Sequence, residues 1–236
     1  MLADLCTVIW KEWIEWKRQY SSRSSTMLIT IVTAVVFALI LPLQYGDGWL
    51  HQGQALYAWL SLPVLLLLRT LGDGFAGERE RHTLETLLAT RLPDPALYLG
   101  KMLVPIVWAW FFTQLVMAIA LIPLNFIYPG SGGFYQPGLL VSGLLLSLLS
   151  CLYAAAAGTF LSLRSATVDQ ANQSMFLFLI LFGILLGVVS GFFHFAAPDA
   201  GILQMVPYMA GTLLVFDVFL VGLIVKTFQR KRLIFR

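Results

Sequence analysis

Six long apolar runs dominate the chain, at roughly 27–45, 54–71, 102–126, 139–163, 175–197 and 206–227. Each is close to the ~20 residues that an α-helix needs to cross ~30 Å of hydrocarbon. A backbone inside lipid must satisfy its own hydrogen bonds, so these runs predict helices. The alternating strands of about ten residues that build a membrane barrel do not occur. The pattern therefore predicts an all-α membrane protein with six transmembrane helices.

The segment before the first run is amphipathic, with a helical period over residues 4–20. Its apolar face carries Leu5, Ile9, Trp13, Trp16 and Tyr20. The other side carries Lys11, Glu12, Glu15 and Arg18. Trp10, Trp13 and Trp16 suit a membrane interface, where an indole ring keeps its N–H in polar surroundings. We expect residues 1–25 to form a cytoplasmic helix lying on the bilayer, with a soluble helix packed on a partner as the alternative.

The longest polar interruption, residues 77–101, separates the second and third apolar runs. Leu84, Leu87 and Leu88 fall on one face of a short helix, which Thr83 can cap and whose first turn holds Glu85. Pro93 and Pro95 are expected to stop it. Two helical turns are not stable alone in water, so the leucine face needs a surface. That surface is either the chain's own membrane helices or a groove on another protein.

Composition and charge agree with a membrane protein. The chain is 59% hydrophobic and 11% charged, where a soluble domain carries about 25% charged residues. With six spans, all 15 basic residues fall on one side of the membrane. The positive-inside rule then places both termini in the cytoplasm, with residues 228–236 as a basic tail. The net charge of +3 follows from this topology and does not indicate a nucleic-acid partner.

The polar segment resembles the loop between the second and third membrane helices in permeases of the ABC-2 family. That loop reads as alternating charges, then Gly-Thr, a Glu, leucines, a small residue, Thr and Pro, with a later Gly-Lys. The matching residues are Glu78, Arg79, Glu80, Thr83, Glu85, Leu87, Leu88, Thr90, Gly100 and Lys101. His82 stands where the family usually has Gly, and Pro93 comes two residues late. The resemblance implies that residues 72–101 are a coupling loop, with a coupling helix at about 82–91.

The resemblance also implies how such a subunit works. The 78–93 loop would dock on a separate P-loop ATPase subunit, which binds ATP and Mg²⁺. Two permease copies, identical or related, would form the pathway between them. The coupling residues would be Glu78, Glu80, Thr83, Leu84, Glu85, Leu87 and Leu88, with the glutamates meeting basic residues at the rim of the contact. An N-terminal elbow helix is common in such permeases.

This chain itself has no nucleotide site, because Gly100-Lys101-Met102 lacks the upstream glycine and the Ser/Thr of a phosphate-binding loop. We therefore expect that it binds no cofactor and is not an enzyme. His51, His82 and His194 are far apart, and no His/Cys/Asp/Glu group has metal-ligand spacing, so no metal site is predicted.

Two features inside the spans each have two interpretations. Asp217 lies near the middle of the last run, where a carboxylate costs ~2.5–3.5 kcal/mol. It would serve either proton or substrate transfer, or a hydrogen bond to a neighbouring helix. Gly183, Gly187 and Gly191 repeat every four residues and allow a second helix to approach closely. That helix would belong either to the same subunit or to a second copy.

The function predicted from these features is a permease subunit in the bacterial inner membrane, exporting a hydrophobic or amphipathic substrate. Two other classes stay open. An ion- or proton-coupled secondary transporter would use Asp217 as its coupling site. A membrane scaffold or assembly protein would use the 77–101 segment for binding only.

Overall fold

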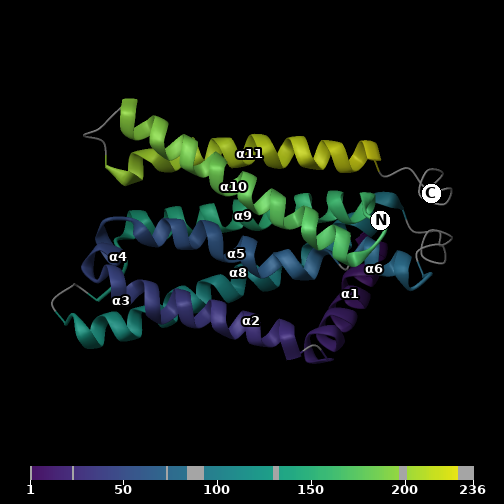
Figure 1. The fold of residues 1–236 in the computed structure, drawn as a ribbon, viewed down its shortest axis with the longest axis horizontal. Helices are drawn as coiled ribbons and strands as arrows, with labels where there is room; N and C mark the ends of the chain where they lie inside the picture. Colours follow the sequence, from purple (N-terminus) through teal and green to yellow (C-terminus); the bar gives the residue numbers. More distant parts are fainter. Residues whose placement is uncertain are drawn as a thin grey trace.

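The computed structural model describes residues 2–22, 24–72, 74–83, 93–129, 133–196 and 201–227, and these residues are built from helices (Figure 1). In chain order the elements are α1 (Leu2–Ser22), α2 (Ser24–Val35), the π-helical turn η1 (Val36–Ile40), α3 (Leu41–Tyr45), α4 (Asp47–His51), α5 (Gln54–Gly72), α6 (Phe75–Glu80), α8 (Asp94–Ile127), α9 (Pro137–Arg164), α10 (Val168–Ala196) and α11 (Ile202–Thr227). The expected all-α architecture is confirmed.

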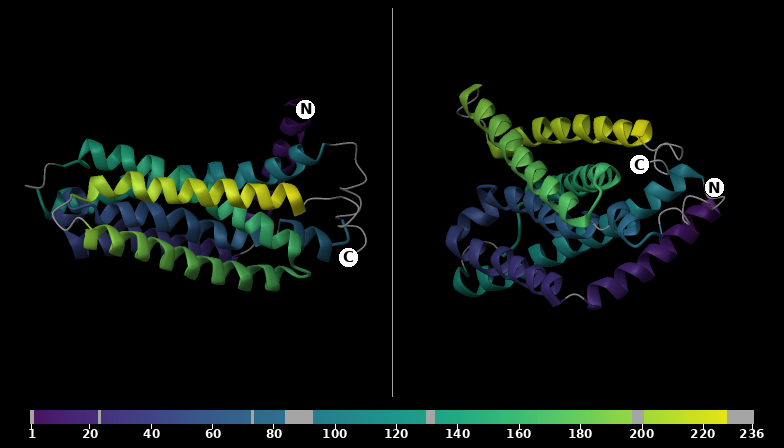
Figure 2. Two further views of the ribbon diagram at one scale, coloured as in Figure 1. Left: turned by 90° about the horizontal axis from the view of Figure 1, so that it is seen from above. Right: turned by 45° about the vertical axis from the view of Figure 1, so that its right-hand side comes forward.

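Six of the helical segments are long and apolar enough to cross a membrane: Met27–Tyr45, Gln54–Glu80, Pro95–Ile127, Pro137–Arg164, Val168–Phe193 and Ile202–Thr227. They run side by side along the long axis of the molecule, whereas α1 lies across one end of it (Figures 1 and 2). We call this end, which carries α1, α6 and the turn between α9 and α10, the basic end. The prediction of six membrane helices is confirmed.

The core of the bundle is the pair α5 and α9, with α8 and α11 packed around it. In the second span, 75% of the most apolar stretch is buried inside the bundle, whereas in α10 the buried share is 6%. Small residues allow the close contact, since a Cβ on Gly143 would lie 2.3 Å from the Trp59 ring. The small patch Ala154–Ala157 of α9 is likewise buried, as its composition predicts for internal packing.

The third span begins earlier than its apolar run. Helix α8 starts at Asp94, with Pro93 in extended conformation before it and Pro95 in its first turn. Proline is well tolerated there because the first N–H groups of a helix have no partner within the helix. Gly100 and Lys101 therefore lie inside a helix, not in a loop, and the two prolines begin α8. The expected preceding helix that these prolines would stop falls on residues 84–92, outside the described part.

Helix α1 packs on α8, and the contact includes residues of its charged side. Lys11 and Glu12 are half-buried, and Val8 is buried, whereas Trp10 and Trp13 are exposed. The charges of Lys11 and Glu12 meet opposite charges on α6 and α8, a contact that the helical pattern of the segment did not predict. The exposed indoles remain predicted interface anchors, and the side chain of Trp16 lies outside the described residues.

Gly100 is a point of close approach between α1 and α8. A Cβ at Gly100 would lie 2.4 Å from Cγ1 of Val8. We expect Gly100→Leu to push α1 off α8 and to lower the free energy of unfolding by about 1–3 kcal/mol. Thermal unfolding in detergent, with hydrogen exchange of residues 2–22, measures both effects. The matched control is Gly211→Leu, where an added Cβ meets nothing within 4 Å; equal behaviour of the two variants would show that the contact does not hold α1.

Candidate functional site

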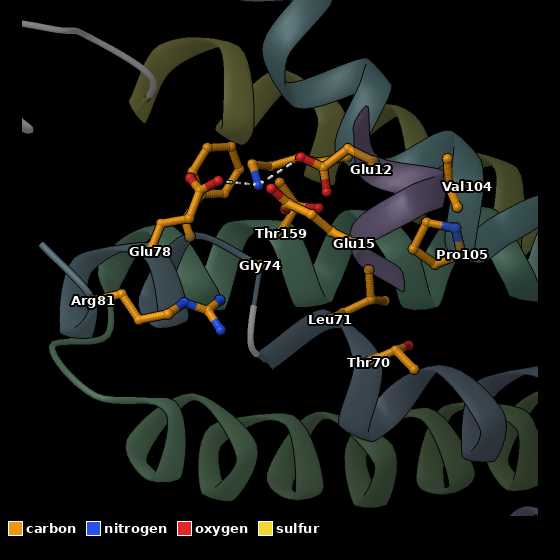
Figure 3. Close-up of a pocket in the computed structure, with 12 residues that line it drawn as sticks. Glu12, Glu15, Thr70, Leu71, Gly74, Glu78, Arg81, Val104, Pro105 and Thr159 are labelled. Carbon is orange, nitrogen blue, oxygen red and sulfur yellow. Dashed lines mark hydrogen bonds and ion pairs between the residues drawn. The ribbon is translucent and has the colours of Figure 1, made fainter. Parts of the chain in front are cut away.

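A buried cluster of charges joins three helices at the basic end. Lys101 of α8 places its Nζ 2.8 Å from Glu78 Oε1 of α6 and 3.0 Å from Glu12 Oε1 of α1. Lys11 of α1 lies 3.2 Å from the same Glu78 oxygen. In Figure 3, dashed lines mark these two ion pairs, and the carboxylates of Glu78 and Glu12 lie on either side of one nitrogen. The cluster therefore ties the start of the polar segment to the N-terminal helix and to the third span.

Because this cluster is buried, each charged group in it needs its ion-pair partner to remain ionised at low cost. Lys101 is 7% exposed and Glu78 is 6% exposed. A buried ion left without its partner costs several kcal/mol. Burial by itself would lower the pKa of Lys11, but the charges of Glu12 and Glu78 outweigh this and raise that pKa. Burial would raise the pKa of Glu12, and the ammonium groups of Lys101 and Lys11 lower it overall.

A small cavity of about 60 Å³ lies beside the cluster. The residues that line it are Glu12, Glu15, Thr70, Leu71, Gly74, Phe75, Glu78, Arg81, Lys101, Val104, Pro105 and Thr159 (Figure 3). Oxygens of Glu12, Glu15 and Glu78 lie within 4.8 Å of one another, a grouping that sequence spacing did not reveal. Two ammonium groups already contact these carboxylates, and their charge disfavours a cation in the same place. This arrangement explains the carboxylates without a metal.

The end of α6 has the geometry of a Schellman motif. The N–H of Thr83 donates to the carbonyl of Glu78 at 2.9 Å, and the N–H of His82 donates to the backbone carbonyl of Arg79 at 3.1 Å. His82 has a φ of 55°, in the left-handed region that glycine occupies most readily. This explains why a position that is Gly in the resembled loop falls here. Thr83 closes α6 in this way, while its predicted role as a cap for a following helix concerns residues outside the described part.

The other predicted coupling residues have two kinds of placement. Glu78 is engaged inside the chain with Lys101 and Lys11, and Glu80 accepts a hydrogen bond from the N–H of Val168 at 2.8 Å. Contacts of these two carboxylates with a partner remain predictions. Leu84, Glu85, Leu87 and Leu88 lie outside the described residues.

Asp217 lies in α11 on the face that packs against α9. It is 8% exposed, and neither of its carboxylate oxygens has a hydrogen-bond partner among the described residues. The alternative of a hydrogen bond to a neighbouring helix is therefore not seen there. Asp217 does not lie with the charge cluster at the basic end.

The glycine stripe of α10 is open in the single chain. A Cβ added at Gly183, Gly187 or Gly191 meets nothing within 4 Å among the described residues. Around the stripe, Ile184 and Val188 are also exposed. Contact with a second copy remains a prediction for this face.

Sequence reasoning missed the joining of Lys101, Glu78 and Glu12. The loop motif includes Lys101 but assigns no role to its charge. The sequence does contain a clue, because Lys101 directly precedes a long apolar run. If the helix of that run begins before Lys101, the ammonium group lies among packed helices and needs an opposite charge.

Six apolar helices with a charged segment anchored at one end define an integral membrane protein. The family model described as ABC-2 type transporter matches residues 3–194, and the chain belongs to this family. It is accordingly a permease subunit of an ABC transporter and an integral membrane protein. The matched residues include the charge cluster and end before α11, which carries Asp217. Searches of curated proteins and of solved structures gave no match.

Proposed function

We propose that this permease exports a hydrophobic or amphipathic substrate and is driven by a separate ATPase subunit that docks on the 78–93 loop. The observation that supports docking at this loop most directly is the buried cluster of Lys101, Glu78 and Glu12. It fixes the base of the loop to α1 and α8, so a push on the loop would reach the bundle. ABC-2 permeases typically work with an ATPase partner.

The arrangement we propose has two permease copies and two ATPase subunits. The ATPase subunits bind ATP and Mg²⁺, and their closure rocks the two bundles from inward-open to outward-open. The leucines Leu84, Leu87 and Leu88 form the apolar contact, with Glu85 at its rim. The open face of α10 around Gly187 meets the second copy. The basic end faces the cytoplasm, by the positive-inside rule, in a bacterial inner membrane.

Capture of the partner tests the proposal. The tagged chain is purified from its host in mild detergent, and proteins that accompany it are identified by mass spectrometry. We expect a P-loop ATPase to be recovered with the parent chain and lost with Leu87→Asp. A charge in an apolar docking contact leaves an unpaired, desolvated group, which costs about 2–5 kcal/mol and thus more than tenfold in affinity.

The control is Phe134→Asp, because Phe134 is 75% exposed and lies between α8 and α9 at the end opposite the basic end. It introduces the same charge where an ATPase on the basic end has no access. Equal recovery of the ATPase with Leu87→Asp and with Phe134→Asp would remove the docking assignment. No ATPase with a folded parent chain would contradict the ATP-driven proposal.

One observation favours a second candidate function, an ion- or proton-coupled transporter. Asp217 is a buried carboxyl group without a hydrogen-bond partner among the described residues, in the sixth span. Intramembrane carboxyl groups often mark ion or proton pathways. This candidate predicts transport that collapses with the proton gradient and does not need an ATPase.

A further inference from the structure

Helix α6 ends with the charged residues Glu78, Arg79 and Glu80, which we call the ERE segment. Successive residues of an α-helix point about 100° apart, so three neighbours reach three different directions. Glu78 reaches α8 and α1. The other two residues reach the turn between α9 and α10, by contacts that the charge cluster does not include.

Arg79 binds the end of α9. Its Nη1 donates to the carbonyl of Ser165, and its Nη2 donates to the carbonyl of Leu163 at 3.2 Å. Helix α9 ends at Arg164, so these are carbonyls at its C-terminus. The last carbonyls of a helix lack partners within the helix and carry its negative dipole end. A guanidinium at this place satisfies both requirements.

Glu80 binds the start of α10. Its Oε1 accepts a hydrogen bond from the N–H of Val168, the first residue of that helix, at 2.8 Å. A carboxylate at a helix N-terminus receives a free donor and the positive dipole end. Arg79 and Glu80 thus match the opposite electrostatic ends of the two helices that flank the turn.

Helix α6 is itself held at both ends, so these contacts do not come from a loose segment. Ser162 Oγ of α9 accepts hydrogen bonds from the N–H groups of Phe75 and Ala76, each at 2.9 Å. The Schellman motif closes the other end of α6. A movement of α6 therefore has to carry the α9–α10 turn with it or break four or more hydrogen bonds.

We propose that Arg79 and Glu80 are positioning residues that make the α9–α10 turn move with α6, while Glu78 does the same for α1 and α8. This rests on the proposed function, since the force on α6 comes from the docked ATPase. A movement of the coupling loop would thus be passed by the ERE segment to two groups of helices. Glu78 passes it to α1 and α8, and Arg79 and Glu80 pass it to the α9–α10 turn. Arg79 and Glu80 contact the helix ends at the α9–α10 turn and do not need to contact the substrate. Through this turn they would move α10, which carries the open glycine face.

The first measurement needs no partner. In the double variant Arg79→Ala/Glu80→Ala, we expect amide exchange in residues 165–172 to rise about three- to tenfold, the effect of losing one or two hydrogen bonds from a local opening equilibrium. The control is His82→Asn, because His82 is exposed and asparagine tolerates its positive φ. Arg79→Lys with Glu80→Gln keeps a cation and an acceptor and should restore much of the protection. Exchange equal to that of the parent would overturn the proposal.

The second measurement separates coupling from local structure. A nitroxide is attached at Phe192→Cys on α10, in a chain with Cys6→Ser and Cys151→Ala, and the complex with the captured ATPase is placed in nanodiscs. In the parent, ATP, Mg²⁺ and vanadate should change the distance between the labels of the two copies. Because Glu80 is also a predicted rim residue of the docking contact, parent and double variant are compared at equal amounts of bound ATPase. At equal occupancy the double variant should lose about half or more of this change.

The outcomes are distinct. A full distance change in the double variant overturns the positioning role, even if amide exchange has risen. If the parent captures no ATPase, the proposed function fails, and amide exchange alone decides whether Arg79 and Glu80 hold the turn.

Discussion

Lys101→Ala is expected to destabilise the protein by about 3–5 kcal/mol, the largest effect of any single change considered for this chain. The lysine is 7% exposed and is the ion-pair partner of both Glu12 and Glu78. Without it, Glu78 remains buried and keeps the ion pair with Lys11, and Oε2 of Glu78 already lacks a hydrogen-bond partner among the described residues. The Phe75 ring, whose centroid lies 5.2 Å from Nζ, also loses its cation. Most of the expected loss comes from the stranded carboxylate.

Thermal unfolding followed by size-exclusion chromatography in detergent measures this effect. Adding Glu78→Gln to Lys101→Ala should recover part of the stability, because a neutral amide costs less to bury than an unpaired carboxylate. Lys17→Ala is the control, since Lys17 is an exposed lysine of α1. If Lys101→Ala behaved like Lys17→Ala, or if Glu78→Gln gave no recovery, the cluster would not hold the basic end together.

Asp217→Leu is expected to stabilise the protein by up to about 2.5–3.5 kcal/mol, the cost of a carboxyl group at the centre of a membrane helix. Asp217 is 8% exposed, and the buried positions on its face of α11 are otherwise apolar, as at Leu213 and Leu220. A leucine would continue that face against α9. Unfolding in detergent measures the gain, and Asp217→Asn serves as the comparison of similar shape.

The same variant separates the two candidate functions. An ATP-driven permease with a structural Asp217 should keep ATP-dependent transport in Asp217→Leu. An ion-coupled transporter should lose transport in both Asp217→Leu and Asp217→Asn while remaining folded. A loss of stability in Asp217→Leu would contradict the expected gain and would show that the carboxyl group has a partner in the folded protein.

The membrane helices could be predicted from the sequence because a single requirement selects them. A run such as 206–227 has to be apolar over its length to face lipid, and α11 occupies nearly the same residues. The loop motif could also be recognised from the sequence, since its residues lie close together in the chain. The family match confirms the resemblance.

The geometry of the candidate site could not be read in the same way. Amphipathicity shows that α1 has two faces, but it does not show which face meets protein when the surroundings include lipid and buried charge. Lys11 and Glu12 resemble surface residues until Glu78 and Lys101 are placed beside them by contacts far apart in the chain. The roles of Arg79 and Glu80 depend likewise on where α9 ends and α10 begins, which the apolar runs locate only to within a few residues.

The uneven burial of the bundle bears on how the chain is made. The second span has the lowest mean hydropathy of the six segments, 1.6, and the highest buried share, 75%. Its main neighbours, α9 and α8, are synthesised after it. On leaving the ribosome α5 therefore enters the bilayer as the least lipophilic span and gains its main neighbour only once α9 is complete at Arg164. Before α8 and α9 follow, lipid covers most of its surface, although in the finished protein it is the span that lipid contacts least.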